Sequence, residues 1–157
     1  MAQVVSVDVS VKDVVWDSVD NVYRGQFKYQ QKSPSNPKII GKTGNIDASA
    51  VNDSLDLTFN LKTKKVKIGG TDYDVSLKNP VNQSVLLGNG ILDKPTNPAP
   101  PSGGPITVNP GGTDSFVMSD SNDNGGKYSY ALELHVDKDG GQKLMDDPII
   151  INRQPSA

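Results

Sequence analysis

Residues 128–136 read YSYALELHV, and large apolar side chains occupy every second position of this stretch. Successive side chains of an extended strand point to opposite faces, so these five apolar residues share one face. They are Tyr128, Tyr130, Leu132, Leu134 and Val136. The positions between them carry Ser129, Ala131, Glu133 and His135. We therefore expect a strand with one buried face and a second face, which includes His135, in water.

The same period of two recurs in four other stretches and predicts further strands. These stretches are Val5–Val11, Tyr23–Tyr29, Leu55–Leu61 and Tyr73–Leu77. Branched and aromatic side chains favour the pleated surface of a sheet, because they pack well there. We find no capped helical run, although a short helical turn is expected near Asp47–Val51. The sequence therefore predicts an all-β protein, built as an antiparallel β-sandwich of the immunoglobulin or cupredoxin type.

Pairs of turn-forming residues separate the expected strands. Gly69-Gly70 predicts a tight hairpin, because two glycines adopt positive φ without steric cost. Asn89-Gly90 predicts a second hairpin, which leads into Ile91-Leu92. Gly125-Gly126 and Gly140-Gly141 flank the Tyr-rich strand, and they predict an antiparallel partner on each of its sides.

The segment KPTNPAPPSGGP, residues 94–105, contains five of the eleven prolines. Proline cannot donate a hydrogen bond to a sheet, so this segment is expected to be an extended connection. We expect it to cross within one sandwich domain that spans residues 1–157. The alternative is two β units, residues 1–93 and 106–157, joined by this segment as a linker. A second unit of 52 residues without disulfides would be small for independent folding.

The composition excludes several classes of function. The chain has 157 residues, no cysteine and a net charge of −2. These values argue against thiolate chemistry, disulfides and a general affinity for nucleic acid. No apolar run approaches the ~18 residues of a membrane span. The first residues lack the order of a signal peptide, so a soluble, cytoplasmic protein is expected.

One loop resembles the first half of a calcium-binding loop. Asp120, Asn122 and Asn124 alternate before Gly125, and oxygen ligands at such positions suit calcium. The twelfth position carries Ala131 instead of the usual glutamate, and Asp/Asn/Gly clusters also form ordinary turns. A turn and a calcium site both stay open, and no other cofactor is indicated. Further oxygen ligands would be Asp146 and Asp147.

Basic and aromatic residues interleave in Arg24–Tyr29, and no acidic residue occurs between Arg24 and Lys42. Strands that read RNA combine rings with cations in this way. The alternation instead favours a sandwich strand with Phe27 and Tyr29 in the core and Lys28 in solvent. Gly41-Lys42-Thr43 is similar to the end of a phosphate-binding loop, but no strand and helix flank it, so we interpret the match as coincidental.

The single tryptophan and the single histidine have alternative interpretations. Trp16 can stack on a sugar ring or pack as partly buried core beside Val14 and Val15. His135 has no cysteine partner, and a G-x-S-x-G elbow is absent, so no catalytic constellation is recognised. The sequence therefore predicts a protein that is not an enzyme.

The order of the last strands resembles the closing part of a cupredoxin-like sandwich. Ile106–Val108, Ser115–Met118, the Tyr-rich strand and Ile149–Ile151 follow one another. This resemblance implies a last strand buried on both faces, but the two histidines and the cysteine of a copper site are missing.

Two families of small bacterial proteins are similar over roughly the last third of the chain. Asp147-Pro148 followed by Pro155 resembles the DP-EP family, although Gln154 stands where a glutamate is expected. The Tyr-rich strand with the terminal Asp-Pro resembles inclusion-body proteins of the AidA/PixA type. Both resemblances imply a bacterial, non-catalytic β protein and identify no binding residue.

Together these features predict a non-enzymatic binding or assembly module that uses polar loops at the ends of the sandwich. The loops are Ser33–Lys38, Asp120–Gly126 and Asp137–Gln142. One alternative is a structural protein that self-associates through edge strands. Another is a carbohydrate-binding protein with Trp16 as a platform and calcium as a possible aid. The expected partner is thus a protein, a glycan or a second copy of the chain.

Overall fold

The structure is a computed structural model that describes residues 2–90, 94–123, 125–146 and 149–151. Within these residues the chain forms thirteen strands and one short 3₁₀ helix. The strands of the first half are β1 (Gln3–Asp17), β2 (Val22–Ser33), β3 (Ile46–Asp47), β4 (Leu55–Leu61), β5 (Lys65–Ile68), β6 (Thr71–Ser76) and β7 (Val85–Gly88). The others are β8 (Asn97–Pro98), β9 (Ile106–Val108), β10 (Ser115–Asp120), β11 (Lys127–Val136), β12 (Gln142–Asp146) and β13 (Ile149–Ile151), and the helix is η1 (Val81–Ser84).

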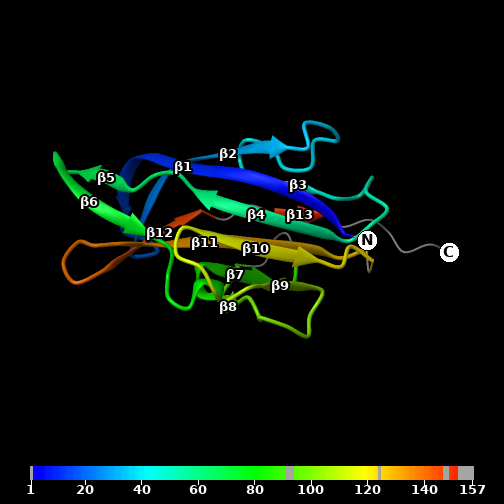
Figure 1. Cartoon of the computed structure of the whole chain (residues 1–157). Helices are drawn as coiled ribbons and strands as arrows, with labels where there is room; N and C mark the ends of the chain where they lie inside the picture. The colour runs from blue at the N-terminus through cyan, green and yellow to red at the C-terminus, as the bar shows by residue number, and fades with distance from the viewer. Residues whose placement is uncertain (1, 91–93, 124, 147–148, 152–157) are drawn as a thin grey trace.

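The all-β, sandwich-like architecture is confirmed (Figure 1). One layer has the order β2-β1-β4-β10-β9. The other layer is organised around β11, which pairs with β13 and β7 near its start and with β12 and β6 near its end. A short parallel contact between β12 and β2 connects the two layers.

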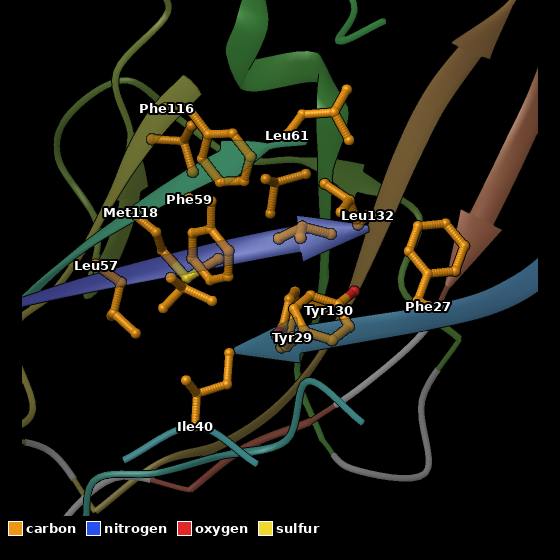
Figure 2. Close-up of a cluster of buried hydrophobic side chains, with 14 of the residues drawn as sticks. Phe27, Tyr29, Ile40, Leu57, Phe59, Leu61, Phe116, Met118, Tyr130 and Leu132 are labelled. Atoms are coloured by element: carbon orange, nitrogen blue, oxygen red, sulfur yellow. The ribbon is translucent and has the colours of Figure 1, made fainter. Parts of the chain in front are cut away.

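The alternating apolar residues meet in one core between the layers. Val5, Val7 and Val9 of β1 are at most 2 % exposed. Figure 2 shows Phe59 of β4, Phe116 of β10 and Tyr130 of β11 in one cluster, although they are far apart in the sequence. The rings of Phe59 and Phe116 stack with their centroids 4.9 Å apart. Full burial of one such side chain stabilises a fold by roughly 1.5–3 kcal/mol, so this cluster holds the two layers together.

The pairing of the strands is mixed rather than purely antiparallel. β1 runs parallel to β4 along seven residue pairs, and β12–β2 and β13–β3 are also parallel. Alternation along one strand is the same in either direction of pairing, because the side-chain period does not depend on the neighbour. The direction of a partner strand therefore was not contained in the pattern.

Two turns behave as the glycine pairs predict. Gly69 and Gly70 have φ of 58° and 83° and connect β5 to β6, with Ile68 paired to Thr71. Gly140-Gly141 connects β11 to the antiparallel strand β12. The hairpin expected at Asn89-Gly90 involves Ile91-Leu92, which lie outside the described residues; β7 pairs instead with β8.

Two expectations about the surroundings of β11 are wrong. Gly125-Gly126 does not form a hairpin, because β10 pairs with β4 and β9 and the chain then passes to the other layer. The second face of β11 is not in water: Ser129, Ala131 and Glu133 are at most 3 % exposed. The segment with η1 packs against β11, which explains this burial. At Asp47–Val51 the structure has a single turn, closed by Val51 N–H donating to the Ala48 carbonyl, instead of a helix.

The proline-rich segment lies along the first half of the chain. Ala99 N donates to the Val85 carbonyl over 2.8 Å, and Val108 N donates to the Pro100 carbonyl over 2.9 Å. Asn82 Nδ2 also donates to the Ala99 carbonyl. The segment therefore passes from β7 towards β9 while it stays hydrogen-bonded to both. Within the described ranges no helix is long and apolar enough to cross a membrane.

Candidate functional site

A pocket of about 550 Å³ lies on the ladder between β1 and β2. The two strands are antiparallel there, and directly paired residues point to the same face of the sheet. The floor consists of three successive residue pairs: Ser10 with Lys28, Val11 with Phe27, and Lys12 with Gln26. The side wall is formed by Lys42 and Thr43. We call this site the lysine pocket.

The wall belongs to a tight turn, Gly41–Asn45, that is hydrogen-bonded at several points. Gly44 N donates to the Gly41 carbonyl and Gly41 N donates to the Asn45 carbonyl, each over 3.0 Å. Tyr29 N of β2 donates to the Lys42 carbonyl over 2.9 Å. These bonds fix the turn against the edge of β2, so Lys42 and Thr43 have a defined place beside the pocket.

The core holds the same turn from below. Gly44 has φ of 92°, and a Cβ atom at this position would lie 2.5 Å from the ring of Tyr29. The hydroxyl of Tyr130 donates to the Gly44 carbonyl, and the hydroxyl of Tyr29 donates to Asp146 Oδ2 over 2.8 Å. Burial, together with the nearby Asp146 charge, raises the pKa of Tyr130 well above its ordinary value. Tyr130 therefore stays a hydrogen-bond donor, and the turn rests on a buried polar anchor.

The charge around the lysine pocket is unbalanced. Three lysines line it, and none of the described lining residues is acidic. In the part of the chain that the structure describes, no ion pair joins Lys12, Lys28 or Lys42 to a carboxylate. The neighbouring hairpin behaves differently, since Lys65 Nζ lies 2.7 Å from Asp74 Oδ1. The positive charge of the pocket is thus left for a ligand or for solvent ions.

The composition of the pocket suits a small anion with an organic part. Two unit charges about 4 Å apart attract by about 4 kcal/mol near a protein surface, at an effective dielectric constant of about 20. The volume falls within the roughly 300–1,000 Å³ that is typical of small-molecule sites. Val11, Phe27 and the lysine stems offer carbon surface, while Ser10, Gln26 and Thr43 offer hydrogen-bonding groups.

The residues of the expected calcium loop have a structural role. Asn122 N donates to Asp120 Oδ1 over 3.0 Å, and both residues are at most 1 % exposed. The side-chain nitrogen of Asn122 donates to the carbonyls of Ala48, Val51 and Asp53 over 3.0–3.2 Å. Asn124 lies outside the described residues. Calcium binding by Asp120, Asn122 and Asn124 stays a prediction.

The other two carboxylates named for that site are placed as follows. Asp146 accepts the hydroxyl of Tyr29 in the buried anchor, and Asp147 lies outside the described residues. Among the residues with described positions, no group of three or more His, Cys, Asp or Glu side chains is arranged to hold a metal ion.

Trp16 is more exposed than a core residue. Its exposed fraction is 46 %, and its ring meets Tyr23 edge-on with centroids 4.9 Å apart. Val15 and Val19 beside it are 63 % and 88 % exposed. The end of the β1–β2 hairpin therefore carries a small apolar patch in solvent.

The polar loops lie at both ends of the molecule. Figure 1 shows Asp137–Gln142 beside the β5–β6 hairpin, whereas the ends of β2 and β10, where Ser33–Lys38 and Asp120–Gly126 begin, lie near the N-terminus. Gln31 organises the first of these loops: its side-chain amide donates to the carbonyls of Pro34 and Pro37 and accepts from Ile39 N. None of the three loops lines the lysine pocket among its described residues.

Comparisons with known proteins give one structural likeness. No protein-family model matches the sequence, and no curated protein matches it. The fold is similar to that of the inclusion body protein PixA from Burkholderia cenocepacia J2315, with 8 % sequence identity and a TM-score of 0.41. The similarity covers 100 % of this chain and 97 % of that chain. PixA belongs to one of the types that the sequence resembles, but a likeness of this size supports no statement about function.

Sequence reasoning reached the parts of the lysine pocket without joining them. The expected places of Phe27 and Tyr29 in the core and of Lys28 in solvent are confirmed. The acid-free segment up to Lys42 was a usable signal of local positive charge. What the sequence could not supply was Lys12, which precedes that segment and joins it only through the register of β1 and β2.

Proposed function

We propose that this protein is a non-enzymatic binding module whose ligand is a small anion held in the lysine pocket. The observation that carries the proposal is the meeting of Lys12, Lys28 and Lys42 around one cavity with no acidic residue among the described residues that line it. Like charges repel, so three ammonium groups beside one pocket are most stable when an anion lies between them. A cytoplasmic location is part of the proposal, to be tested by fractionation of producing cells.

The described sheet edges favour ligand binding over edge-to-edge assembly. β9 at one end of the strand order has three residues, and β3 at the other end has two. On the β5–β6 hairpin, the β5 strand carries Lys65 and Lys67. Short or lysine-bearing edges resist pairing with another chain. A partner chain that adds to an edge strand would therefore find little backbone to pair with.

Carbohydrate binding at Trp16 is a second candidate function, supported by the 46 % exposure of that ring. Calcium at Asp120 would not assist it. Asp120 is paired to Leu55, which is paired to Gln3 at the start of β1, whereas Trp16 lies near the end of that strand. At about 3.3 Å per residue the two positions are roughly 40 Å apart along β1. Sugar titrations that quench the fluorescence of Trp16 would support this candidate, and unchanged fluorescence across a set of neutral sugars would exclude it.

The main proposal is tested by thermal unfolding with a panel of small anions. A ligand at about 100 times its Kd stabilises the native state by about 2.7 kcal/mol, which corresponds to roughly 5–10 °C in Tm for a chain of this length. The variant with Lys12→Gln, Lys28→Gln and Lys42→Gln should bind at least about tenfold more weakly, because three contacts of about 0.5–1 kcal/mol each are lost.

A matched control removes the same net charge elsewhere. Lys64→Gln, Lys94→Gln and Lys127→Gln change three lysines that do not line the pocket. This control should bind anions like the unaltered protein. An equal rise of Tm in all three proteins would reflect a general salt effect and would contradict the proposal.

A further inference from the structure

We infer that the ligand of the lysine pocket is a phosphate monoester of a small organic molecule, with its phosphate group against the Gly41–Asn45 turn. This inference rests on the proposed function and names the class of anion. It uses three observations: the backbone of the turn, the kind of cation in the pocket, and the size of the pocket relative to one phosphate group.

The turn offers backbone donors next to a lysine. The hydrogen bond from Gly44 N to the Gly41 carbonyl places Lys42 and Thr43 at the two central positions of a β-turn. The N–H groups of these two residues donate no hydrogen bond within the part of the chain that is described. The carbonyl of Lys42 accepts from Tyr29 on β2, and in a trans peptide the next N–H points the opposite way. The N–H of Thr43 therefore points outward from β2, and successive turn N–H groups of this kind bind anions.

The cations are all lysines, which favours phosphate over carboxylate. An ammonium group is a compact, strongly hydrated point charge, whereas the planar fork of arginine matches a carboxylate with two parallel bonds. The pocket has no arginine among its described lining residues. Lys12, Lys28 and Lys42 come from three separate segments, so they can meet different oxygens of a tetrahedral group. The hydroxyls of Ser10 and Thr43 supply further donors.

The rest of the pocket requires an organic part. A cavity of about 550 Å³ is much larger than one phosphate group needs, and Val11 and Phe27 contribute to its floor. Inorganic phosphate would leave this carbon surface in water. A nucleic acid is a poor alternative, because the positive charge is local and the whole chain has a net charge of −2. A small phosphorylated molecule satisfies both the charge and the carbon surface.

Phenyl phosphate, phenyl sulfate, phenylacetate and inorganic phosphate form a matched set of probes for calorimetric titration. The second proton of a phosphate monoester dissociates near pH 6, whereas a sulfate monoester carries one charge throughout. Lysine side chains keep their charge across this range. The titratable groups lining the pocket are the three lysines, and Asp13 lies next to Lys12 in an adjoining hollow. A carboxylate such as Asp13 is already ionised above about pH 5.

We expect phenyl phosphate to bind about tenfold more tightly at pH 7.5 than at pH 5, in proportion to the dianion present. Phenyl sulfate should show no such rise, and phenylacetate and inorganic phosphate should bind at least about tenfold more weakly than phenyl phosphate at pH 7.5. Lys42→Gln alone should weaken phenyl phosphate by about tenfold and reduce the rise with pH. Lys127→Gln, which lies on β11 outside the pocket, should leave both unchanged.

The possible failures are distinguishable. If phenyl sulfate and phenylacetate bind as tightly as phenyl phosphate and all three need the pocket lysines, the phosphate assignment is wrong while the anion-binding module stands. If inorganic phosphate binds most tightly, the organic part is wrong. If a single-stranded oligonucleotide displaces phenyl phosphate with a steep dependence on salt, the small-molecule assignment is overturned. If no anion distinguishes the triple lysine variant from its control, both the inference and the proposed function fail.

Discussion

At the scale of single residues, Asn122 shows how one side chain fits two interpretations. Its spacing from Asp120 is that of a calcium loop, yet its side-chain nitrogen bonds three carbonyls of the 48–53 segment. Asn122 has φ of 54°, a conformation that asparagine tolerates better than most residues. The same chemical features, a short amide and tolerance of positive φ, suit both a ligand loop and a structural turn, so sequence could not separate them.

Replacement of Asn122 by alanine should destabilise the protein by about 2–4 kcal/mol, because it leaves buried carbonyls without their donor. Asn60→Ala is the matched control, since Asn60 is only part-buried and makes one long bond of 3.5 Å to Ser6 Oγ. Urea unfolding of both variants measures the difference in free energy. Equal, small losses would show that the three bonds of Asn122 contribute little.

Calcium is tested separately at the same loop. Binding to the native state must raise Tm by mass action, so calcium held by Asp120, Asn122 and Asn124 predicts a higher Tm in millimolar calcium than in chelator. Asp120→Asn should remove that rise. The calcium hypothesis has to be abandoned when Tm of the unaltered protein is the same in both buffers.

Glu133 is a second residue whose surroundings the alternation did not reveal. Its side chain is 3 % exposed and forms an ion pair with Lys78, and Lys143 Nζ lies 3.4 Å from its other oxygen. Lys78 follows β6, so the cation comes from a segment that covers the second face of β11. The period of two placed Glu133 on the face opposite the core, but it carried no information about a covering loop.

Lys78→Met should cost roughly 3–5 kcal/mol, because it leaves a buried carboxylate without its main cation. Lys143→Met is the control: its lysine is 59 % exposed, and an exposed pair contributes only about 0–1 kcal/mol. Chemical denaturation of the two variants gives the comparison. A loss for Lys78→Met no larger than for Lys143→Met would mean that Glu133 is solvated well enough without Lys78.

At the scale of elements, the strands themselves were predictable and their partners were not. Five alternating stretches became β1, β2, β4, β6 and β11, with their apolar positions directed to the core. The pattern says which face is buried because burial acts on every second residue. It says nothing about whether the neighbour is β4 or β10, since both present the same kind of face.

The Gly41–Asn45 turn is the element on which the lysine pocket depends. Gly44→Ala should destabilise the protein and weaken phenyl phosphate binding, because its Cβ would lie 2.5–2.9 Å from the ring of Tyr29. Gly69→Ala is the control: its φ is also positive, but no atom lies within 4 Å of the added Cβ. The strain of about 1–2 kcal/mol from positive φ is common to both, so the extra loss in Gly44→Ala, measured by urea unfolding, reports the clash.

For the pocket, a larger loss in Gly44→Ala should be accompanied by weaker binding, and Gly69→Ala should bind normally. If Gly44→Ala is less stable but binds phenyl phosphate as tightly as the unaltered protein, then the position of the turn does not matter for the ligand. The wall of the pocket would in that case be formed by Lys12 and Lys28 alone.

At the scale of the whole molecule, overall charge concealed a local charge. The net value of −2 argues against a general affinity for polyanions, and yet the segment from Arg24 to Lys42 has five basic residues and no acidic one. The fold adds Lys12 to this segment through the β1–β2 register. The class of fold was thus predictable from periodicity, whereas the site was not, because it is created by pairing between residues about thirty positions apart.

The single-domain organisation stays a proposal, and the strand order gives it a sharp test. β10 of the second half pairs with β4 along six residue pairs, and β12 pairs with β2. β11 pairs with β7 and with β6, which also belong to the first half. Fragments 1–93 and 106–157 would each expose the core faces of several strands, and neither would keep the layer that it packs against. We therefore expect both fragments to be unfolded or aggregated when produced alone, as judged by circular dichroism and by poor dispersion of amide signals in NMR spectra. Mixing or co-producing the fragments should restore a folded complex, because the missing strand partners are then supplied. A fragment that is folded by itself would support two β units joined by residues 94–105, and the pairing of β4 with β10 would then be a contact between domains.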